Sequence, residues 1–164
     1  MIMLSAPLGD MTRLRREGVK LLIVDDSKIV ADRLAAFIQE RSPASRIVGH
    51  ARDGVQALEY IQDLQPDVII LDIQMPGRSG IEVLRDVKAM PAPPVVIILT
   101  NYPLPQYRKR CMEEGADYFF DKSTQFEEIP RVLDVLIRRA PDRKNGGRAE
   151  VSTVPGHDSA GGYP

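Results

Sequence analysis

Three carboxylates follow two strongly apolar segments of the chain and are candidates for a shared site. Asp72 ends the apolar run 68–71, and the adjacent Asp25 and Asp26 end the run 21–24. Ligands of parallel α/β sheets bind at the carboxyl ends of the strands, which is where these side chains would lie. Mg²⁺ prefers oxygen ligands and keeps several waters, so few protein ligands are enough to hold it. We therefore expect the three carboxylates to share a Mg²⁺ ion.

A hydroxyl and a lysine end two further apolar segments. The run 95–99 ends in Thr100, and the segment 118–120 leads into Asp121 and Lys122. A carboxylate can attack phosphorus as a nucleophile and form an acyl phosphate. Lys122 could then pair with the phosphoryl oxygens, and Thr100 could donate a hydrogen bond to one of them. Catalysis would consist chiefly of in-line positioning and charge neutralisation.

The elements that must position these residues alternate between short apolar segments and helical patterns, which favours a parallel sheet built from βαβ units. We expect five strands and five helices. The strands are expected at about 20–25, 46–51 (a shorter one), 67–72, 95–100 and 118–120. Ser27 is a plausible N-cap for the first helix, whose apolar stripe would be Val30, Leu34, Phe37 and Ile38. Gly115 fits the position just after the end of the fourth helix.

Length and composition limit what the rest of the chain can be. The 164 residues suit one domain over 20–140, with an N-terminal extension over 1–19. Residues 141–164 are rich in Gly, Ser and Pro and poor in apolar residues, so we expect a disordered tail. The net charge of −1 gives no general reason to expect nucleic-acid or membrane binding. The single cysteine, Cys111, fits a reducing compartment, and a cytoplasmic location is expected.

These motifs together resemble the receiver domain of two-component response regulators, over roughly residues 20–140. The resemblance rests on the acidic pair, the strand-end hydroxyl and lysine, and the turn after Asp72, which contains Met75, Pro76, Gly77 and Gly80. It implies an α/β, flavodoxin-like, doubly wound fold with strand order 2-1-3-4-5. It also implies that Asp72 is phosphorylated from a phosphohistidine on a partner kinase.

The same resemblance assigns roles to single residues. It implies that Asp26, Asp72 and the backbone carbonyl of Gln74 bind Mg²⁺, with Asp25 acting mainly through a bound water. The aromatic switch position of the family, three residues before the lysine, falls on Phe119.

Two positions depart from the family pattern. The lysine of the family is usually followed by a proline in a cis peptide, whereas Lys122 precedes Ser123. A cis bond before a residue other than proline costs about 2.5–4 kcal/mol, so we expect this bond to be trans. Asn101 follows Thr100, where the family usually has a smaller Ala or Gly.

The expected function is that of a stand-alone response regulator receiver, a phosphoprotein that switches protein–protein interactions. It would not be an enzyme beyond catalysing its own phosphorylation and dephosphorylation. Its partners would be a sensor histidine kinase or phosphotransfer protein, and a downstream protein that binds the surface formed by the fourth helix, the fifth strand and the fifth helix. No nucleic acid or membrane is expected as a partner.

Other functions are compatible with parts of this pattern. The chain could be a phosphorelay intermediate or a phosphate sink. A phosphatase of the haloacid-dehalogenase type also uses a strand-end Asp, Mg²⁺ and a lysine, but it needs a second Asp where this chain has Gln74. A pseudo-receiver that only binds partners would not need the complete set of acidic, hydroxyl and lysine side chains.

Overall fold

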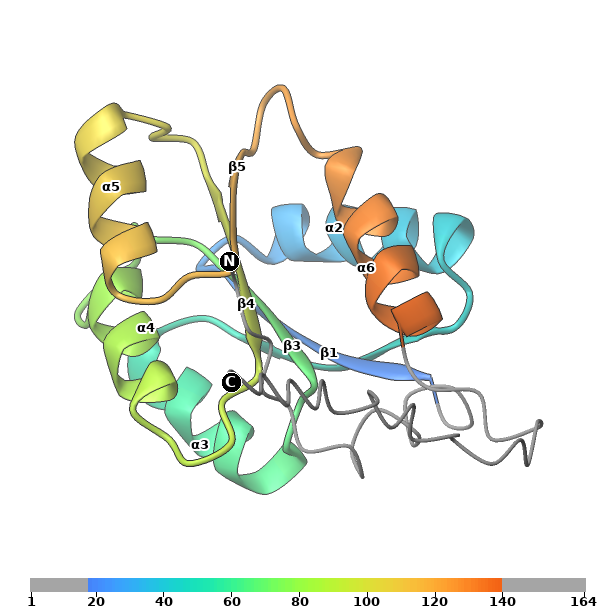
Figure 1. The fold of residues 1–164 in the computed structure, drawn as a ribbon, viewed down its shortest axis with the longest axis horizontal. Coiled ribbons are helices and arrows are strands. Elements are labelled where there is room, and N and C mark those ends of the chain that lie inside the picture. Colours follow the sequence, from blue (N-terminus) through green and yellow to red (C-terminus); the bar gives the residue numbers. More distant parts are fainter. Residues whose placement is uncertain (1–17, 140–164) are drawn as a thin grey trace, which may run out of the picture.

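The computed structural model describes residues 18–139, which form a single parallel sheet with helices on both faces (Figure 1). The strands are β1 (Val19–Val24), β2 (Ser45–Ala51), β3 (Val68–Leu71), β4 (Val95–Thr100) and β5 (Tyr118–Asp121). The helices are α2 (Lys28–Arg41), α3 (Gly54–Leu64), α4 (Gly80–Lys88), α5 (Pro105–Glu113) and α6 (Glu128–Arg139).

The strand order is β2-β1-β3-β4-β5, and every neighbouring pair is parallel. The expected doubly wound fold with order 2-1-3-4-5 is therefore confirmed. The expectations of an N-terminal extension and a disordered tail concern residues that lie almost entirely outside the described range. Within residues 18–139, no helix is long and apolar enough to cross a membrane.

Different helices cover the two faces of the sheet. Helices α3, α4 and α5 pack on one face, and α2 and α6 pack on the other (Figure 1). Successive residues of a strand point to opposite faces, so Leu22 and Val24 of β1 enter the first core while Leu21 and Ile23 enter the second. A strand buried on both sides must be apolar at nearly every position, which explains the continuous apolar runs. Each such side chain stabilises the fold by about 1.5–3 kcal/mol.

Local sequence signals fix the helices that flank the acidic residues. Ser27 is the N-cap of α2 as expected, and its side chain accepts a hydrogen bond from the Val30 N–H at 3.3 Å. Ser79 caps α4 in a capping box with Glu82. At Gly80 a Cβ would run into the carbonyl oxygen of Asp72, so only glycine lets α4 start this close to the turn. Gly115 follows α5 with φ +97°, as expected for a residue after a helix end.

The second strand differs from the expectation. β2 begins at Ser45 and, with seven residues, is the longest of the described strands instead of a short one. β2 is an edge strand, so it has a neighbouring strand on one side only, and most of its side chains are partly exposed. Polar residues such as Arg46 and His50 can therefore interrupt its apolar pattern. A register shift opposite Leu21 and Leu22 also leaves one extra residue in β2.

Two side chains face differently from the expected stripe. In α2 the buried residues are Ala31, Leu34 and Ile38, whereas Val30 and Phe37 stay partly exposed. The small side chain of Ala31 lets the helix approach the sheet, and the larger Val30 lies to the side. Phe119 lies within the strand expected at 118–120: it is the second residue of β5 and pairs with Ile98.

Candidate functional site

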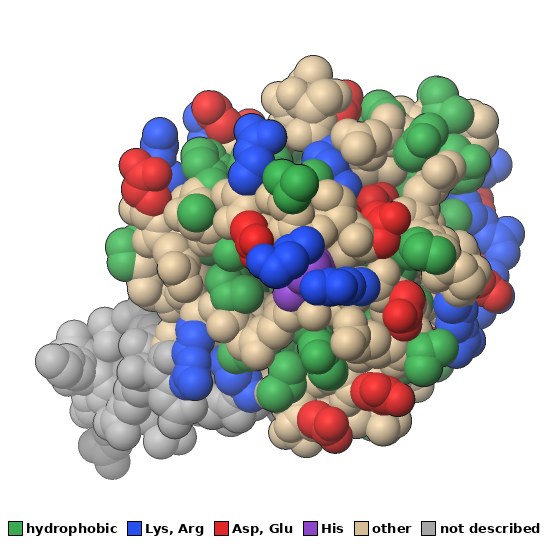
Figure 2. Space-filling model, turned by 180° about the vertical axis from the view of Figure 1, so that it is seen from behind, with side chains coloured by type: hydrophobic (Ala, Val, Ile, Leu, Met, Phe, Trp, Pro, Cys, Tyr) green, Lys and Arg blue, Asp and Glu red, His purple; other side chains and the backbone are tan. Residues whose placement is uncertain are grey.

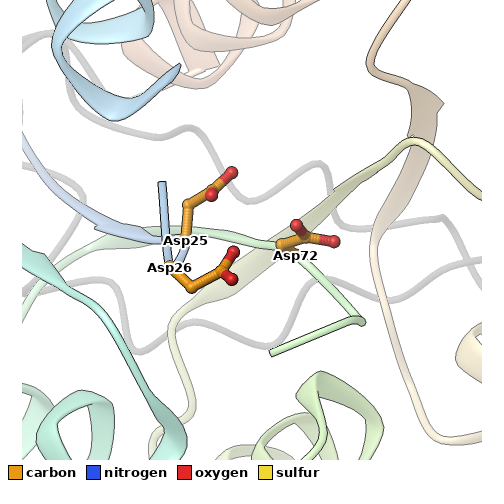
Figure 3. A group of neighbouring side chains, drawn as sticks. All are labelled: Asp25, Asp26 and Asp72. Carbon is orange, nitrogen blue, oxygen red and sulfur yellow. The ribbon is translucent and has the colours of Figure 1, made fainter. Parts of the chain in front are cut away.

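Three carboxylates meet at the carboxyl edge of the sheet (Figure 3). Asp25 and Asp26 directly follow β1, and Asp72 directly follows β3. The two strands pair side by side, so the acidic groups are neighbours. One oxygen from each carboxylate lies within 4.8 Å of the others. Asp25 and Asp72 are buried and Asp26 is exposed, which gives an all-oxygen donor set of the kind Mg²⁺ prefers, open on the side of Asp26.

Lys122 places its ammonium group between two of these acids. Its Nζ lies 2.6 Å from Oδ2 of Asp25 and 3.0 Å from Oδ2 of Asp72. Its backbone N–H donates to the carbonyl of Thr100 at 2.8 Å, which holds the residue beside the end of β4. Burial alone would lower the pKa of Lys122, but the hydrogen bonds and charges of Asp25 and Asp72 outweigh it and raise the pKa above its usual value. The side chain is therefore a cation held at the acidic cluster.

The pKa of the Asp72 carboxyl depends on its burial and on its charged and hydrogen-bonding neighbours. Burial raises the pKa of this carboxyl, and the charge and hydrogen bond of Lys122 oppose that effect, as does the N–H of Gln74. The Gln74 N–H donates to Oδ1 at 3.2 Å, while Lys122 occupies Oδ2. The Asp25 charge adds to the rise. The net shift of the Asp72 pKa is upward, so a further cation at this place would favour the carboxylate.

Asp25 is held by hydrogen bonds to both its side chain and its backbone. Its Oδ1 accepts from the Ser27 N–H at 2.8 Å and its Oδ2 accepts from Lys122. Its backbone carbonyl is hydrogen-bonded to Nε2 of His50 at 2.7 Å. Sequence reasoning gave His50 no role. The signal that could have found it is its position on the neighbouring strand, where it pairs with Ile23, two residues before Asp25.

Thr100 lies beside this cluster, at the end of β4, and is fully buried. Its Oγ1 accepts a hydrogen bond from the Tyr102 N–H at 3.0 Å, which leaves the hydroxyl hydrogen available for another acceptor.

Phe119 packs away from the cluster, in the core beneath α5, with only 3% of its surface exposed. The guanidinium carbon of Arg108 lies 4.8 Å from the centre of its ring, and Arg108 Nη2 donates to the Phe119 carbonyl at 3.3 Å. The sequence analysis did not predict this contact. Spacing along the chain gives no signal for it, because the two residues lie on different elements.

None of the peptide bonds in the described residues is cis, so the Lys122–Ser123 bond is trans, as expected. Ser123 therefore enters a different turn from the one that a cis proline would form.

Comparisons with known proteins agree with this fold and site. The family model described as the response regulator receiver domain matches residues 21–134. The chain is 38% identical over 145 residues to protein-glutamate methylesterase/protein-glutamine glutaminase 4 of Myxococcus xanthus, a match that covers 79% of this chain and 41% of that protein. It is 34% identical over 119 residues to the transcriptional regulatory protein YdfI of Bacillus subtilis, covering 73% and 55% of the two chains.

A solved structure shows the same likeness. The crystal structure of the response regulator domain of Thermotoga maritima CheB superposes with a TM-score of 0.62 and 32% sequence identity, over 74% of this chain and 95% of that one. Because the family model covers most of the sequence, the chain belongs to the response regulator receiver domain family of two-component systems. The resemblance inferred from the sequence is thus confirmed.

The chain spans between about a third and a little over half of the length of the curated relatives that it matches. These relatives include a methylesterase and a transcriptional regulator by name, and the match leaves much of each protein uncovered. The expectations that this chain is not an enzyme and has no nucleic-acid partner therefore stay predictions.

Proposed function

We propose that the chain is a phosphorylation switch in which Asp72 accepts a phosphoryl group from the phosphohistidine of a sensor histidine kinase or a phosphotransfer protein. One observation carries this proposal: Asp72 ends a buried strand with Lys122 on one oxygen and the acidic pair beside it. The acidic pair could hold a metal cation and Lys122 supplies a positive charge, and both would favour the transfer of a negatively charged phosphoryl group to the Asp72 carboxylate.

In the proposed reaction, a carboxylate oxygen of Asp72 attacks the phosphorus atom in line with the bond to be broken. A P–O bond forms and the P–N bond to the donor imidazole breaks. The electron pair of that bond stays on the imidazole nitrogen, which takes up a proton from solvent. Lys122, held 3.0 Å from Asp72, is placed to pair with the phosphoryl oxygens as they arrive. The Thr100 hydroxyl is proposed to donate to one of them.

Asp25, Asp26, Asp72 and the backbone carbonyl of Gln74 would hold Mg²⁺. The fit rests on the three carboxylate oxygens within 4.8 Å and on their all-oxygen chemistry. When bound, the ion would supply charge neutralisation for the carboxylates and the phosphoryl oxygens. The chain itself orients the acids: the Ser27 N–H holds Asp25 and the Gln74 N–H holds Asp72.

Phosphorylation would be read by other proteins through the surface formed by α5, β5 and α6. Movement of Thr100 towards the phosphate would change the space open to Phe119, which shifts an existing equilibrium between two packings. The coupling free energy between phosphorylation and partner binding equals the difference in how strongly the phosphate stabilises the two packings, typically about 1–3 kcal/mol. Figure 2 shows the molecule from behind, away from the β5 edge of the sheet, and on that side basic and acidic side chains are mixed, without one dominant sign. That side of the molecule therefore lacks the single-sign charge that would favour a nucleic acid there.

In this proposal the domain extends over residues 20–140 and catalyses only its own phosphorylation and dephosphorylation. A role as a relay intermediate or phosphate sink uses the same acceptor chemistry and differs only in where the phosphoryl group goes next.

The test is phosphoryl uptake from acetyl phosphate, followed by intact-protein mass spectrometry. We expect one phosphoryl group per chain in the presence of Mg²⁺ and none after chelation. Asp72→Asn keeps the shape of the side chain but removes the nucleophile, and it should take up none. Normal uptake by Asp72→Asn would contradict the assignment. Turnover of a generic phosphate ester would instead support a phosphatase.

A further inference from the structure

The loop that carries Lys122 is held by a polar turn built from its neighbours. Oδ1 of Asp121 accepts two hydrogen bonds from Ser123, one from its backbone N–H at 2.9 Å and one from its hydroxyl at 2.6 Å. Gln125 closes the turn from the other side. Its Oε1 accepts from the Asp121 N–H at 2.9 Å, and its own N–H donates to the Asp121 carbonyl at 2.8 Å.

These bonds fix the backbone on both sides of Lys122. Asp121 is the last residue of β5 and pairs with Thr100, and the Lys122 N–H bonds to the Thr100 carbonyl. Beyond Lys122 the chain leaves the sheet and enters the turn that is closed by the hydrogen bonds of Asp121 to Ser123 and Gln125. A lysine side chain has several rotatable bonds, so its ammonium reaches a fixed point only if its backbone is fixed. The Nζ does lie at a fixed point, between Asp25 and Asp72.

The carboxylate of Asp121 is not part of the acidic cluster. Its Oδ1 accepts two hydrogen bonds from Ser123, and these bonds, with smaller contributions from Thr124, hold the pKa of Asp121 below its usual value. It does not cap the following helix either, because α6 begins only at Glu128. Its contacts therefore serve the turn around Lys122.

We propose that Asp121, acting through Ser123, is a positioning residue that holds the Lys122 ammonium at Asp72. The turn built by Asp121 and Ser123 would replace the one that a proline after the lysine forms in the family. The inference rests on the proposed phosphoryl transfer to Asp72. It adds a residue that touches neither the phosphoryl group nor the metal but sets how fast transfer occurs.

The experiment measures the rate of phosphoryl uptake from acetyl phosphate for the full chain and five variants, the fifth being the double variant described below. Asp121→Ala removes the acceptor of both bonds, and we expect uptake to slow by about tenfold, below the roughly hundredfold that a misplacement of 1 Å can cause. Asp121→Asn keeps an oxygen at Oδ1 and should restore the rate to near that of the wild type. Glu114→Ala is the matched control, since it also removes a partly exposed acid with two partners, Arg85 and Arg110, but just after the end of α5. It should leave the rate unchanged.

A double-mutant cycle separates positioning from general destabilisation. Lys122→Ala should slow uptake more than Asp121→Ala, and adding Asp121→Ala to Lys122→Ala should have no further effect, because the residue acts only through the lysine. A second readout needs neither Mg²⁺ nor phosphate: the amide resonance of Ser123 should move in Asp121→Ala and stay nearly in place in Asp121→Asn.

The outcomes distinguish a failure of the positioning role of Asp121 from a failure of the proposed phosphoryl transfer to Asp72. If Lys122→Ala is slow but Asp121→Ala is as fast as the wild type, the positioning role is wrong and the proposed function stands. An equal slowing by Asp121→Ala with and without Lys122 also overturns the positioning role. If the wild-type chain takes up no phosphoryl group, both proposals are overturned.

Discussion

At the scale of single residues, the site is defined by an excess of negative charge. Three carboxylates, with one oxygen of each within 4.8 Å of the others, face one ammonium group. Two like charges at about that distance near a protein surface repel by about 3–4 kcal/mol. A divalent cation relieves this repulsion. The sequence predicted this grouping because each side chain follows a buried strand. It did not predict the Asp121–Ser123 turn or the His50 contact, which depend on the path of loops and on an edge strand.

The charge excess predicts that Asp26 contributes to metal binding. Asp26→Ala should weaken Mg²⁺ affinity by about tenfold, because a divalent ion held by few carboxylates loses much of its charge compensation. Isothermal titration of the unphosphorylated chain measures this change. Asp32→Ala is the control, since Asp32 is an exposed acid paired with Lys28 on α2. Equal Mg²⁺ affinities for the wild type and Asp26→Ala would exclude this role for Asp26.

Cys111 gives a prediction about reactivity. Burial, with a smaller contribution from the Glu114 charge, raises the pKa of its thiol to about 11. The thiolate is the reactive form, so the folded chain should react very slowly with a thiol reagent at pH 8 and faster as the pH approaches 11. In urea the thiol should react at once. Rapid labelling of the folded chain at pH 8 would contradict this prediction and would show that the packing of α5 on the sheet, which buries Cys111, opens easily.

At the scale of elements, the sequence predicted the strands that are buried on both faces and was less accurate at the edge of the sheet. Continuous apolar runs identify β1, β3 and β4 because almost every side chain in these strands is buried. β2 was expected to be shorter than it is, since the polar residues of an edge strand resemble a loop. Helix stripes were right in period, but period alone cannot decide between Val30 and Ala31 as the buried residue.

Contacts between elements give a third prediction. Arg108 joins α5 to β5 through the face of the Phe119 ring and its carbonyl. Arg108→Ala should lower the free energy of unfolding by about 1 kcal/mol, the size of a cation–π contact at a partly exposed site. It should also shift the ring resonances of Phe119, because the ring gains freedom to change its packing.

Lys109→Ala is the matched control for Arg108. Lys109 neighbours it on α5 and makes only an exposed pair with Glu113 at 3.8 Å, so its loss should change stability by less than about 0.5 kcal/mol. Urea unfolding measures both variants. Equal effects of the two substitutions would mean that Arg108 does not hold the ring.

At the scale of the whole molecule, the site lies where the topology places ligands. The chain builds β2 on one side of β1 and then returns to place β3 on the other, so the winding reverses between β1 and β3. Crevices at such reversal points bind ligands in doubly wound sheets. Asp25 and Asp26 lie on one side of this point and Asp72 on the other. The resemblance of the motifs to receiver domains implied this arrangement, because that family has the strand order 2-1-3-4-5.

Coupling between the site and the fold gives a fourth prediction. Mg²⁺ binds an arrangement that only the folded chain has, so it should raise the free energy of unfolding by about 2.7 kcal/mol at a concentration 100-fold above its dissociation constant. Thermal unfolding with and without Mg²⁺ measures the effect. Asp72→Asn should show a smaller increase, because one ligand charge is lost. An identical increase in the wild type and Asp72→Asn would mean that Mg²⁺ acts elsewhere.

The central claim is that Asp72 carries the phosphoryl group, and locating the modified residue tests it most directly. Borohydride reduces an aspartyl phosphate to homoserine, which survives digestion and is found by peptide mass spectrometry. After reaction with acetyl phosphate and Mg²⁺, we expect homoserine at position 72 and at no other aspartate of the chain. Homoserine at Asp25, Asp26 or any other aspartate, with none at 72, would contradict the account.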